Sequence, residues 1–144
     1  MFKYEKSVLI NRPQQEVFDF VTNLTNDPEW QSNIESVEQM SDGPIGVGST
    51  WRYVTKFLGR KNETEIQMTS YDPPHQSSVK AVSGPLPFEN THKFQDQDGG
   101  TMLTLTGQIE IGGFFKMAEG LAGKQIEKQM DADAAALKNL LEAG

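Results

Sequence analysis

The sequence contains no cysteine, and this absence removes several kinds of site at once. Without thiols the chain can form no disulfide, no thiolate metal site and no cysteine nucleophile. Of its histidines, His75 lies in a Pro-Pro-His turn and His92 lies in a β-like stretch, and neither has a partner at metal-ligand spacing. The sequence therefore predicts neither a metal nor a cofactor.

Positive charge is also scarce. The 144 residues include 13 Lys and Arg against 20 Asp and Glu, which gives a net charge of −7. Because nucleic acids and many membrane surfaces are negatively charged, this balance argues against nucleic-acid and anionic-membrane partners. No run approaches the ~18 consecutive apolar residues of a membrane span, and the N-terminus lacks the apolar region of a secretory signal. We therefore expect a soluble, cytoplasmic protein.

What the sequence does contain is one long amphipathic segment at its C-terminal end. From about Gly113 to Gly144, apolar residues recur every three or four positions, which is the helical period. The opposite face is charged, with Lys124 and Lys128 among its members, and is expected to face solvent. The predicted apolar stripe consists of Ala118, Ala122, Ile126, Met130, Ala134, Leu137 and Leu141. A one-sided helix of this length needs a long apolar surface to pack against.

The rest of the chain predicts that surface. An alternating strand at 2–10 is followed by a helix at 13–23 and a shorter helical piece from Asn26. Six further β-like segments, separated by Gly, Pro and Asp turns, cover 34–40, 49–58, 62–71, 77–83, 88–95 and 101–111. Consecutive strands with short turns form an antiparallel meander. The expected fold is α+β in a single domain, 1–144: a curved antiparallel sheet of about seven strands wrapped on a long C-terminal helix, with two short helices between the first and second strands.

Alternation places large and polar side chains on the sheet face that should meet the helix. They are Trp51, Tyr53, Phe57, Met68, Phe88, Asn90, His92 and Phe94. Because buried polar groups need partners, this mixture predicts a cavity that holds water or a ligand. Trp30, Met117 and Leu121 complete the predicted ligand-binding set.

Three of these residues allow two interpretations each. His92 can bind or polarise a ligand oxygen, or it can be a core histidine with both nitrogens hydrogen-bonded. Tyr53 can donate its hydroxyl to a ligand, or it can be a core tyrosine with its hydroxyl at the rim. Trp30 can cover the mouth of the cavity, or it can anchor the short helices. His92 and Tyr53 are the catalytic candidates, without a catalytic role being assigned to either.

Four segments carry a family resemblance. They are 10–13 with 16–21 (Ile-Asn-Arg-Pro and Glu-Val-Phe-Asp-Phe-Val), 26–30 (Asn-Asp-Pro-Glu-Trp), 46–51 (Gly-Val-Gly-Ser-Thr-Trp) and 94–105. With the terminal helix, they resemble the SRPBCC superfamily, also called START-like or polyketide cyclase/dehydrase and lipid-transport proteins. The resemblance implies a helix-grip fold of the START/Bet v type, with a hydrophobic cavity between the sheet and the last helix. It covers essentially the whole chain.

Two main functions remain open. The favoured one is a non-catalytic carrier or sensor of a small apolar molecule, such as a lipid, a polyketide or an aromatic compound, because no acid–base pair stands at a readable spacing. The alternative is a polyketide cyclase/aromatase-like enzyme, in which the cavity folds a reactive chain and His92 or Tyr53 moves a proton. A third interpretation is a module that binds a partner through the outer face of the sheet. A homodimer is compatible with all three.

Overall fold

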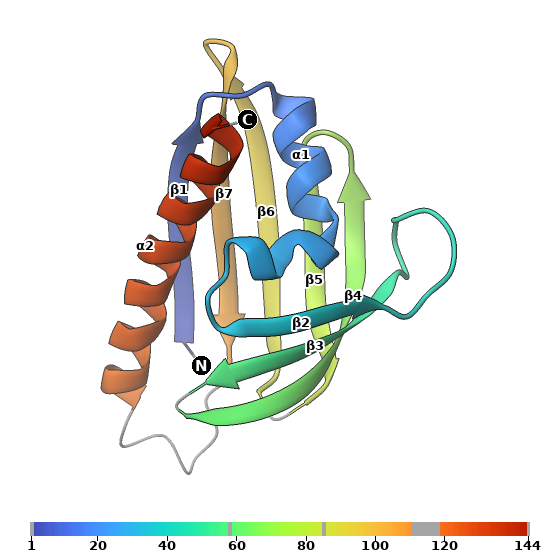
Figure 1. The fold of residues 1–144 in the computed structure, drawn as a ribbon, viewed down its shortest axis with the longest axis vertical. Helices are drawn as coiled ribbons and strands as arrows, with labels where there is room; N and C mark the ends of the chain where they lie inside the picture. Colours follow the sequence, from blue (N-terminus) through green and yellow to red (C-terminus); the bar gives the residue numbers. More distant parts are fainter. Residues whose placement is uncertain (1, 58, 85, 111–118, 144) are drawn as a thin grey trace.

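A computed structural model describes residues 2–57, 59–84, 86–110 and 119–143, which form one curved sheet and three helices (Figure 1). Along the chain the elements are β1 (Phe2–Ile10), α1 (Gln14–Thr22), the 3-10 helix η1 (Leu24–Glu29), β2 (Ile34–Gln39), β3 (Thr50–Phe57), β4 (Arg60–Asp72), β5 (Gln76–Ser83), β6 (Phe88–Gln97), β7 (Gly100–Ile109) and α2 (Glu119–Ala143).

The sheet has seven strands in the order β1-β7-β6-β5-β4-β3-β2, and every pairing is antiparallel. From β2 to β7 each strand pairs with the next one in sequence, as expected of a meander. The first strand pairs with the last, which leaves β1 and β2 at opposite edges of the sheet. The two short helices span the sheet from one edge to the other, because they connect β1 to β2. The predicted α+β, helix-grip fold is confirmed, including the number of strands and the position of the short helices.

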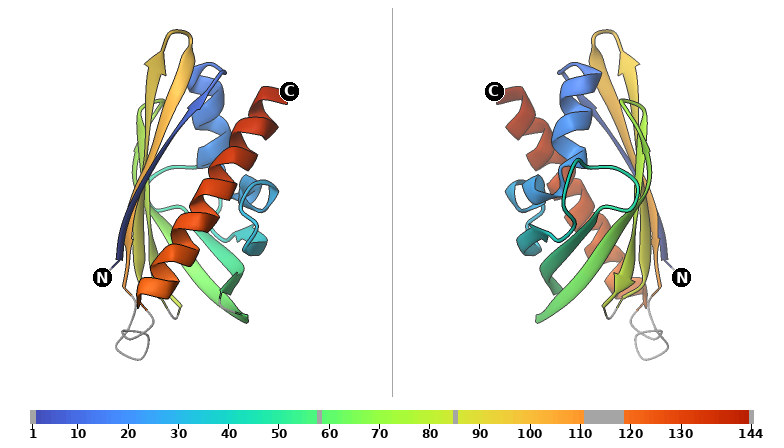
Figure 2. Two further views of the ribbon diagram at one scale, coloured as in Figure 1. Left: turned by 90° about the vertical axis from the view of Figure 1, so that its left-hand side faces the viewer. Right: turned by 90° about the vertical axis from the view of Figure 1, so that its right-hand side faces the viewer.

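All three helices lie on the concave face of the sheet, and α2 crosses this face obliquely (Figure 2). Ile126, Ala134, Leu137 and Leu141 are buried, whereas the charged residues at 124, 127, 128 and 131 are exposed. The predicted stripe is therefore correct over this part of α2, with Met130 half-buried. Residue 118 and the side chain of residue 122 lie outside the described part of the chain.

Gly123 sets how closely α2 approaches β1. A Cβ built at this position would lie 2.7 Å from Cε2 of Phe2, closer than real side chains come. The glycine therefore lets the ring of Phe2 pack directly on the helix backbone. This contact fixes one end of α2 against the edge of the sheet.

Arg12 fixes the other end of α2. Its Nε donates to the carbonyl oxygen of Leu141 at 2.8 Å, and its Nη2 donates to the carbonyl oxygen of Glu142 at 3.2 Å. The amide of Asn11 donates to Oε2 of Glu142 at 2.8 Å. The last carbonyls of a helix have no partner within the helix, and a cation near them is also favoured by the helix dipole. The turn after β1 thus holds the C-terminal end of α2.

Two apolar clusters fill most of the space between the sheet and the helices. One lies where α1 and the C-terminal half of α2 meet β6 and β7, and consists of Ile10, Val17, Phe18, Val21, Trp30, Phe94, Leu103, Leu105, Leu137 and Leu141. The other cluster joins η1 to β2, β3, β4 and β5, on the same concave face. It consists of Leu24, Ile34, Trp51, Tyr53, Ile66, Met68 and Val79. Members of both clusters form the wall of the site described next.

Candidate ligand-binding site

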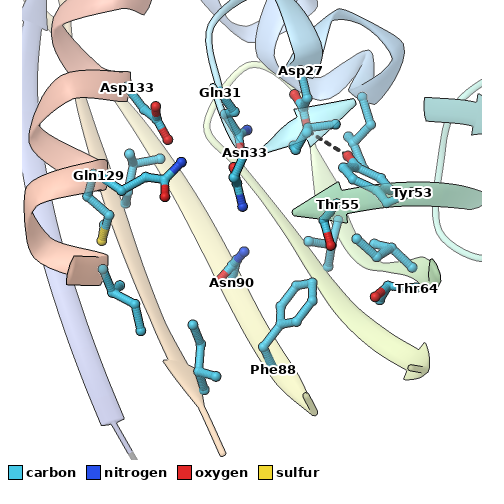
Figure 3. Close-up of a pocket in the computed structure, with 18 of the residues that line it drawn as sticks. Asp27, Gln31, Asn33, Tyr53, Thr55, Thr64, Phe88, Asn90, Gln129 and Asp133 are labelled. Atoms are coloured by element: carbon cyan, nitrogen blue, oxygen red, sulfur yellow. Dashed lines mark hydrogen bonds between the residues drawn. The ribbon is translucent and has the colours of Figure 1, made fainter. Parts of the chain in front are cut away.

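A cavity of about 240 Å³ lies between the concave face of the sheet, η1 with the loop that follows it, and the middle of α2 (Figure 3). Most of its wall is apolar. Ile66, Phe88, Leu105 and Ile109 contribute from the sheet, and Ile126 and Met130 contribute from α2. The alternation of the strands explains this composition, because it directs one set of side chains from neighbouring strands toward the helix.

Five of the predicted site residues line this cavity: Trp30, Tyr53, Phe88, Asn90 and His92. They come from the end of η1, from β3 and from β6. Their position satisfies the geometric condition for contact with a ligand, and the contact itself stays a prediction.

Trp51, Met68 and Phe94 lie elsewhere, so this part of the predicted lining is corrected. Trp51 and Met68 are fully buried in the cluster that includes Leu24 of η1. The ring of Phe94 packs edge-on against the ring of Phe18 of α1, with 5.1 Å between the ring centroids. Alternation identifies the inward face of a strand, but α1 and η1 decide which part of that face is covered. Of the remaining predicted residues, Met117 and the side chains of Phe57 and Leu121 lie outside the described residues.

The most distinctive polar group in the wall is a pair formed by Asp27 and Tyr53. The Tyr53 hydroxyl donates to Oδ2 of Asp27 at 2.5 Å, and both side chains are buried (Figure 3). Burial raises the pKa of Asp27 to about 7, partly opposed by Tyr53 and by the nearby indole of Trp30. The pKa of Tyr53 is raised well above its ordinary value by burial and by the adjacent carboxyl group. Asp27 can therefore exchange a proton near neutral pH inside the cavity.

Sequence reasoning did not select Asp27. It stands in an Asn-Asp-Pro stretch where an acidic residue is ordinary at the start of a helix. Tyr53 is 26 positions further along the chain, on β3, and no local pattern links the two. Neither Trp30 interpretation excludes the other in the structure, since Trp30 is buried in an apolar cluster and also lines the cavity.

His92 presents a neutral imidazole to the cavity. Burial lowers its pKa to about 4, so that the ring is uncharged at neutral pH. Across the sheet it stands beside Ser77 on β5 and Leu105 on β7, its side chain is half-buried at the cavity wall, and none of the hydrogen bonds between described residues involves its ring. A core histidine with a purely structural role should have protein partners for these nitrogens. The arrangement thus favours the ligand-facing interpretation, which stays a prediction.

A row of three residues on adjacent strands shapes the cavity floor. Tyr4 on β1 pairs with Gly107 on β7, which pairs in turn with Asn90 on β6. A Cβ at Gly107 would collide with the Tyr4 hydroxyl and with Oδ1 of Asn90, so the glycine makes room for both polar groups. Oδ1 of Asn90 is buried and has no hydrogen-bond partner among the described residues. Burial raises the pKa of Tyr4 above its ordinary value, which keeps its hydroxyl protonated.

A second carboxylate comes from α2. Asp133 is buried, and its Oδ1 accepts a hydrogen bond of 3.4 Å from the amide of Ser32. Burial raises its pKa to about 6. In Figure 3 it lies near Gln129 and Gln31. Helical periodicity did not predict this position, because Asp133 is charged and is not one of the apolar residues that define the stripe, although it precedes Ala134, which is.

Within 2–57, 59–84, 86–110 and 119–143, no group of three or more His, Asp or Glu side chains is placed to hold a metal ion. In the same ranges no helix is long and apolar enough to cross a membrane.

Residues 1–142 match the protein-family model described as polyketide cyclase / dehydrase and lipid transport. The chain belongs to this family. The relationship expected from the four sequence segments is therefore confirmed, and with it the START-like superfamily. A search of curated protein sequences finds no match.

Solved structures of the same fold come from several bacteria. A Thermus thermophilus protein has 19% identity and a TM-score of 0.85, with 99% of this chain and 98% of that one covered. The Streptomyces aromatase/cyclase Zhui has 17% identity and a TM-score of 0.80, with coverage of 98% and 93%. A START superfamily protein of Mycobacterium smegmatis has 18% identity and a TM-score of 0.77, with coverage of 98% and 97%. At these identities the similarity shows the fold alone.

Proposed function

We propose that the protein binds a small, ring-bearing apolar molecule in the cavity between the sheet and α2, as a carrier or sensor. The observation that carries this proposal is the apolar cavity of about 240 Å³. An apolar cavity of ~150 Å³ can hold benzene, and pockets for drug-sized ligands measure ~300–1,000 Å³. The volume therefore suits a ligand of one or two rings better than a long acyl chain.

Titration with a neutral two-ring probe, 1-naphthylmethanol, tests this proposal by calorimetry. Ile126→Phe should fill the cavity from α2 and abolish binding, because Ile126 is part of the wall. Ala135→Leu adds volume at an exposed position of the same helix and should leave binding unchanged. Equal binding by the parent and by a folded Ile126→Phe variant would show that the probe binds elsewhere.

A catalytic role is the second candidate, and the Asp27–Tyr53 pair favours it. A carboxyl group with a pKa near 7 is suited to accept and return a proton at neutral pH, as cyclisation and dehydration require. The neutral His92 supplies a further donor or acceptor in the same cavity.

Deuterium exchange at the carbon next to the carbonyl of 1-tetralone, a two-ring ketone, distinguishes the two functions. An enzyme should speed this exchange, as followed by NMR in D₂O, and Asp27→Asn should abolish the acceleration. Tyr53→Phe should alter its pH profile, since the hydroxyl no longer acts on the carboxyl group. An exchange rate equal to that in buffer, despite binding, supports the carrier or sensor.

A further inference from the structure

The charges in the cavity wall are all of one sign. Asp27 and Asp133 both contribute carboxylates, and no lysine or arginine is among the described residues that line the cavity. In Figure 3 both carboxylates lie toward one end, with Gln31 and Asn33 between them, and Phe88 lies toward the other end. The carboxyl groups of the wall thus lie at one end of the cavity, and the end near Phe88 carries no charged side chain among the labelled residues.

The nearest candidate for a compensating cation does not serve this purpose. Lys6 lies in the inward-facing row of β1, opposite Leu105. Its Nζ, however, pairs at 2.9 Å with Asp131, an exposed residue of α2, and Lys6 is not part of the wall. The lysines at 124 and 128 of α2 are exposed to solvent. The described protein groups therefore leave both carboxylates without a cation in the cavity.

We infer that the ligand combines an apolar ring system with a protonated amine, and that the cavity rejects organic carboxylates. This inference rests on the proposed function and adds the charge of the ligand to it. A carboxylate removed from water is costly unless it is paired, and an ammonium group at the end of the cavity where Asp27 and Asp133 lie would provide that pairing. An anionic ligand would instead bring its own negative charge next to these acidic groups.

Two further observations agree with this charge preference. Oδ1 of Asn90, which lies further along the wall toward Phe88, is a buried acceptor without a donor among the described residues, so this part of the wall also offers an acceptor and no cation. Burial also raises the pKa of Asp27 to about 7 and that of Asp133 to about 6, as expected for carboxyl groups that lack a nearby cation. A bound ammonium would lower both pKa values, so that the protein should release protons when the ligand binds.

Three probes that share one ring system test the inference by calorimetry near neutral pH: 1-naphthylmethylamine, 1-naphthylmethanol and 1-naphthoate. The amine should bind about tenfold or more tightly than the alcohol, and the carboxylate about tenfold or more weakly, since each charge acts in a partly dry cavity. Binding of the amine should also release protons, detected as a dependence of the heat on the ionisation enthalpy of the buffer.

Asp133→Asn should reduce the advantage of the amine over the alcohol several-fold, measured as the ratio of the two affinities in the same variant. Asp27→Asn should do the same, and its amide oxygen can still accept from Tyr53. Glu127→Gln is the matched control, because it removes the same charge from an exposed position of α2 and should preserve the advantage.

Two results overturn the inference alone: a carboxylate that binds as tightly as the alcohol, or an amine advantage that survives in folded Asp27→Asn and Asp133→Asn variants. Failure of all three probes to bind, the neutral alcohol included, overturns the proposed function and the inference together. The alcohol thus separates the two failures.

Discussion

Replacing Asp27 by asparagine should change how the free energy of unfolding depends on pH. The substitution keeps the size of the side chain and an acceptor for the Tyr53 hydroxyl, and removes only the ionisable group. Burial raises the pKa of Asp27 from 3.8 to about 7 in the folded protein. Between these values the folded state holds a proton that the unfolded state has released. The stability contributed by Asp27 is therefore present below pH ~4 and is lost as the pH rises through ~7.

The size of this effect follows from the pKa shift. One pH unit corresponds to ~1.4 kcal/mol per proton, so a shift of about three units amounts to roughly 4 kcal/mol. A typical domain is stable by only ~5–15 kcal/mol, which makes a change of this size easy to measure. We expect the stability of Asp27→Asn relative to the parent to rise with pH between ~4 and ~7 and to level off above.

His92 makes it necessary to compare the variant with the parent rather than to follow the parent alone. Burial lowers the pKa of His92 from 6.5 to about 4. Its contribution is therefore present above pH ~6.5 and is lost as the pH falls through ~4, which is opposite in sign to that of Asp27. The two partly cancel in the parent protein over this range. Because His92 and Asp133 are present in both proteins, the comparison isolates the change that follows from removing the Asp27 carboxyl group.

Urea unfolding followed by tryptophan fluorescence, at several pH values between ~4.5 and ~8, measures the difference. Asn139→Ala is the control, because it changes an exposed residue of α2 that has no ionisable side chain and should produce a nearly constant difference. A difference between Asp27→Asn and the parent that does not vary with pH would refute the reasoning, since Asp27 would then have an ordinary pKa in the folded state.

Five other substitutions, one of them a control, test the packing and the site. Arg12→Ala should destabilise the protein by ~1.5–3 kcal/mol, measured by urea unfolding, because the last carbonyls of α2 lose a charged donor. Leu137→Ala should cost ~2–5 kcal/mol, whereas Lys128→Ala on the exposed face should change stability by less than ~0.5 kcal/mol; equal costs would place the stripe wrongly. Gly107→Ala should displace the groups at the cavity floor and weaken binding of 1-naphthylmethanol, and unchanged affinity would show that the floor is not in contact with the probe. His92→Phe should keep the melting temperature and change which probe binds best; a large fall in melting temperature with binding intact would assign His92 a structural role.

The periodicity of the sequence was sufficient to predict the architecture of the fold. Alternation located every strand, and the three- to four-residue repeat located the buried face of α2 from Ile126 to Leu141. Both signals are local, because they report which side of a strand or helix leaves water. The antiparallel order also followed, since short turns between consecutive strands allow few other arrangements. The same signals placed Tyr53 and His92 on the face toward the cavity.

The position of the cavity on that face was decided only by the tertiary structure. Phe94 and His92 are two residues apart on β6, yet α1 packs over the first and leaves the second at the cavity wall. The same holds for the pairing of Asp27 with Tyr53 and for the contact of Arg12 with the end of α2. Each joins elements that are distant in the chain, and their meeting depends on how the helices cross the sheet. No periodic pattern encodes that crossing, so the acidic end of the cavity became visible only in three dimensions.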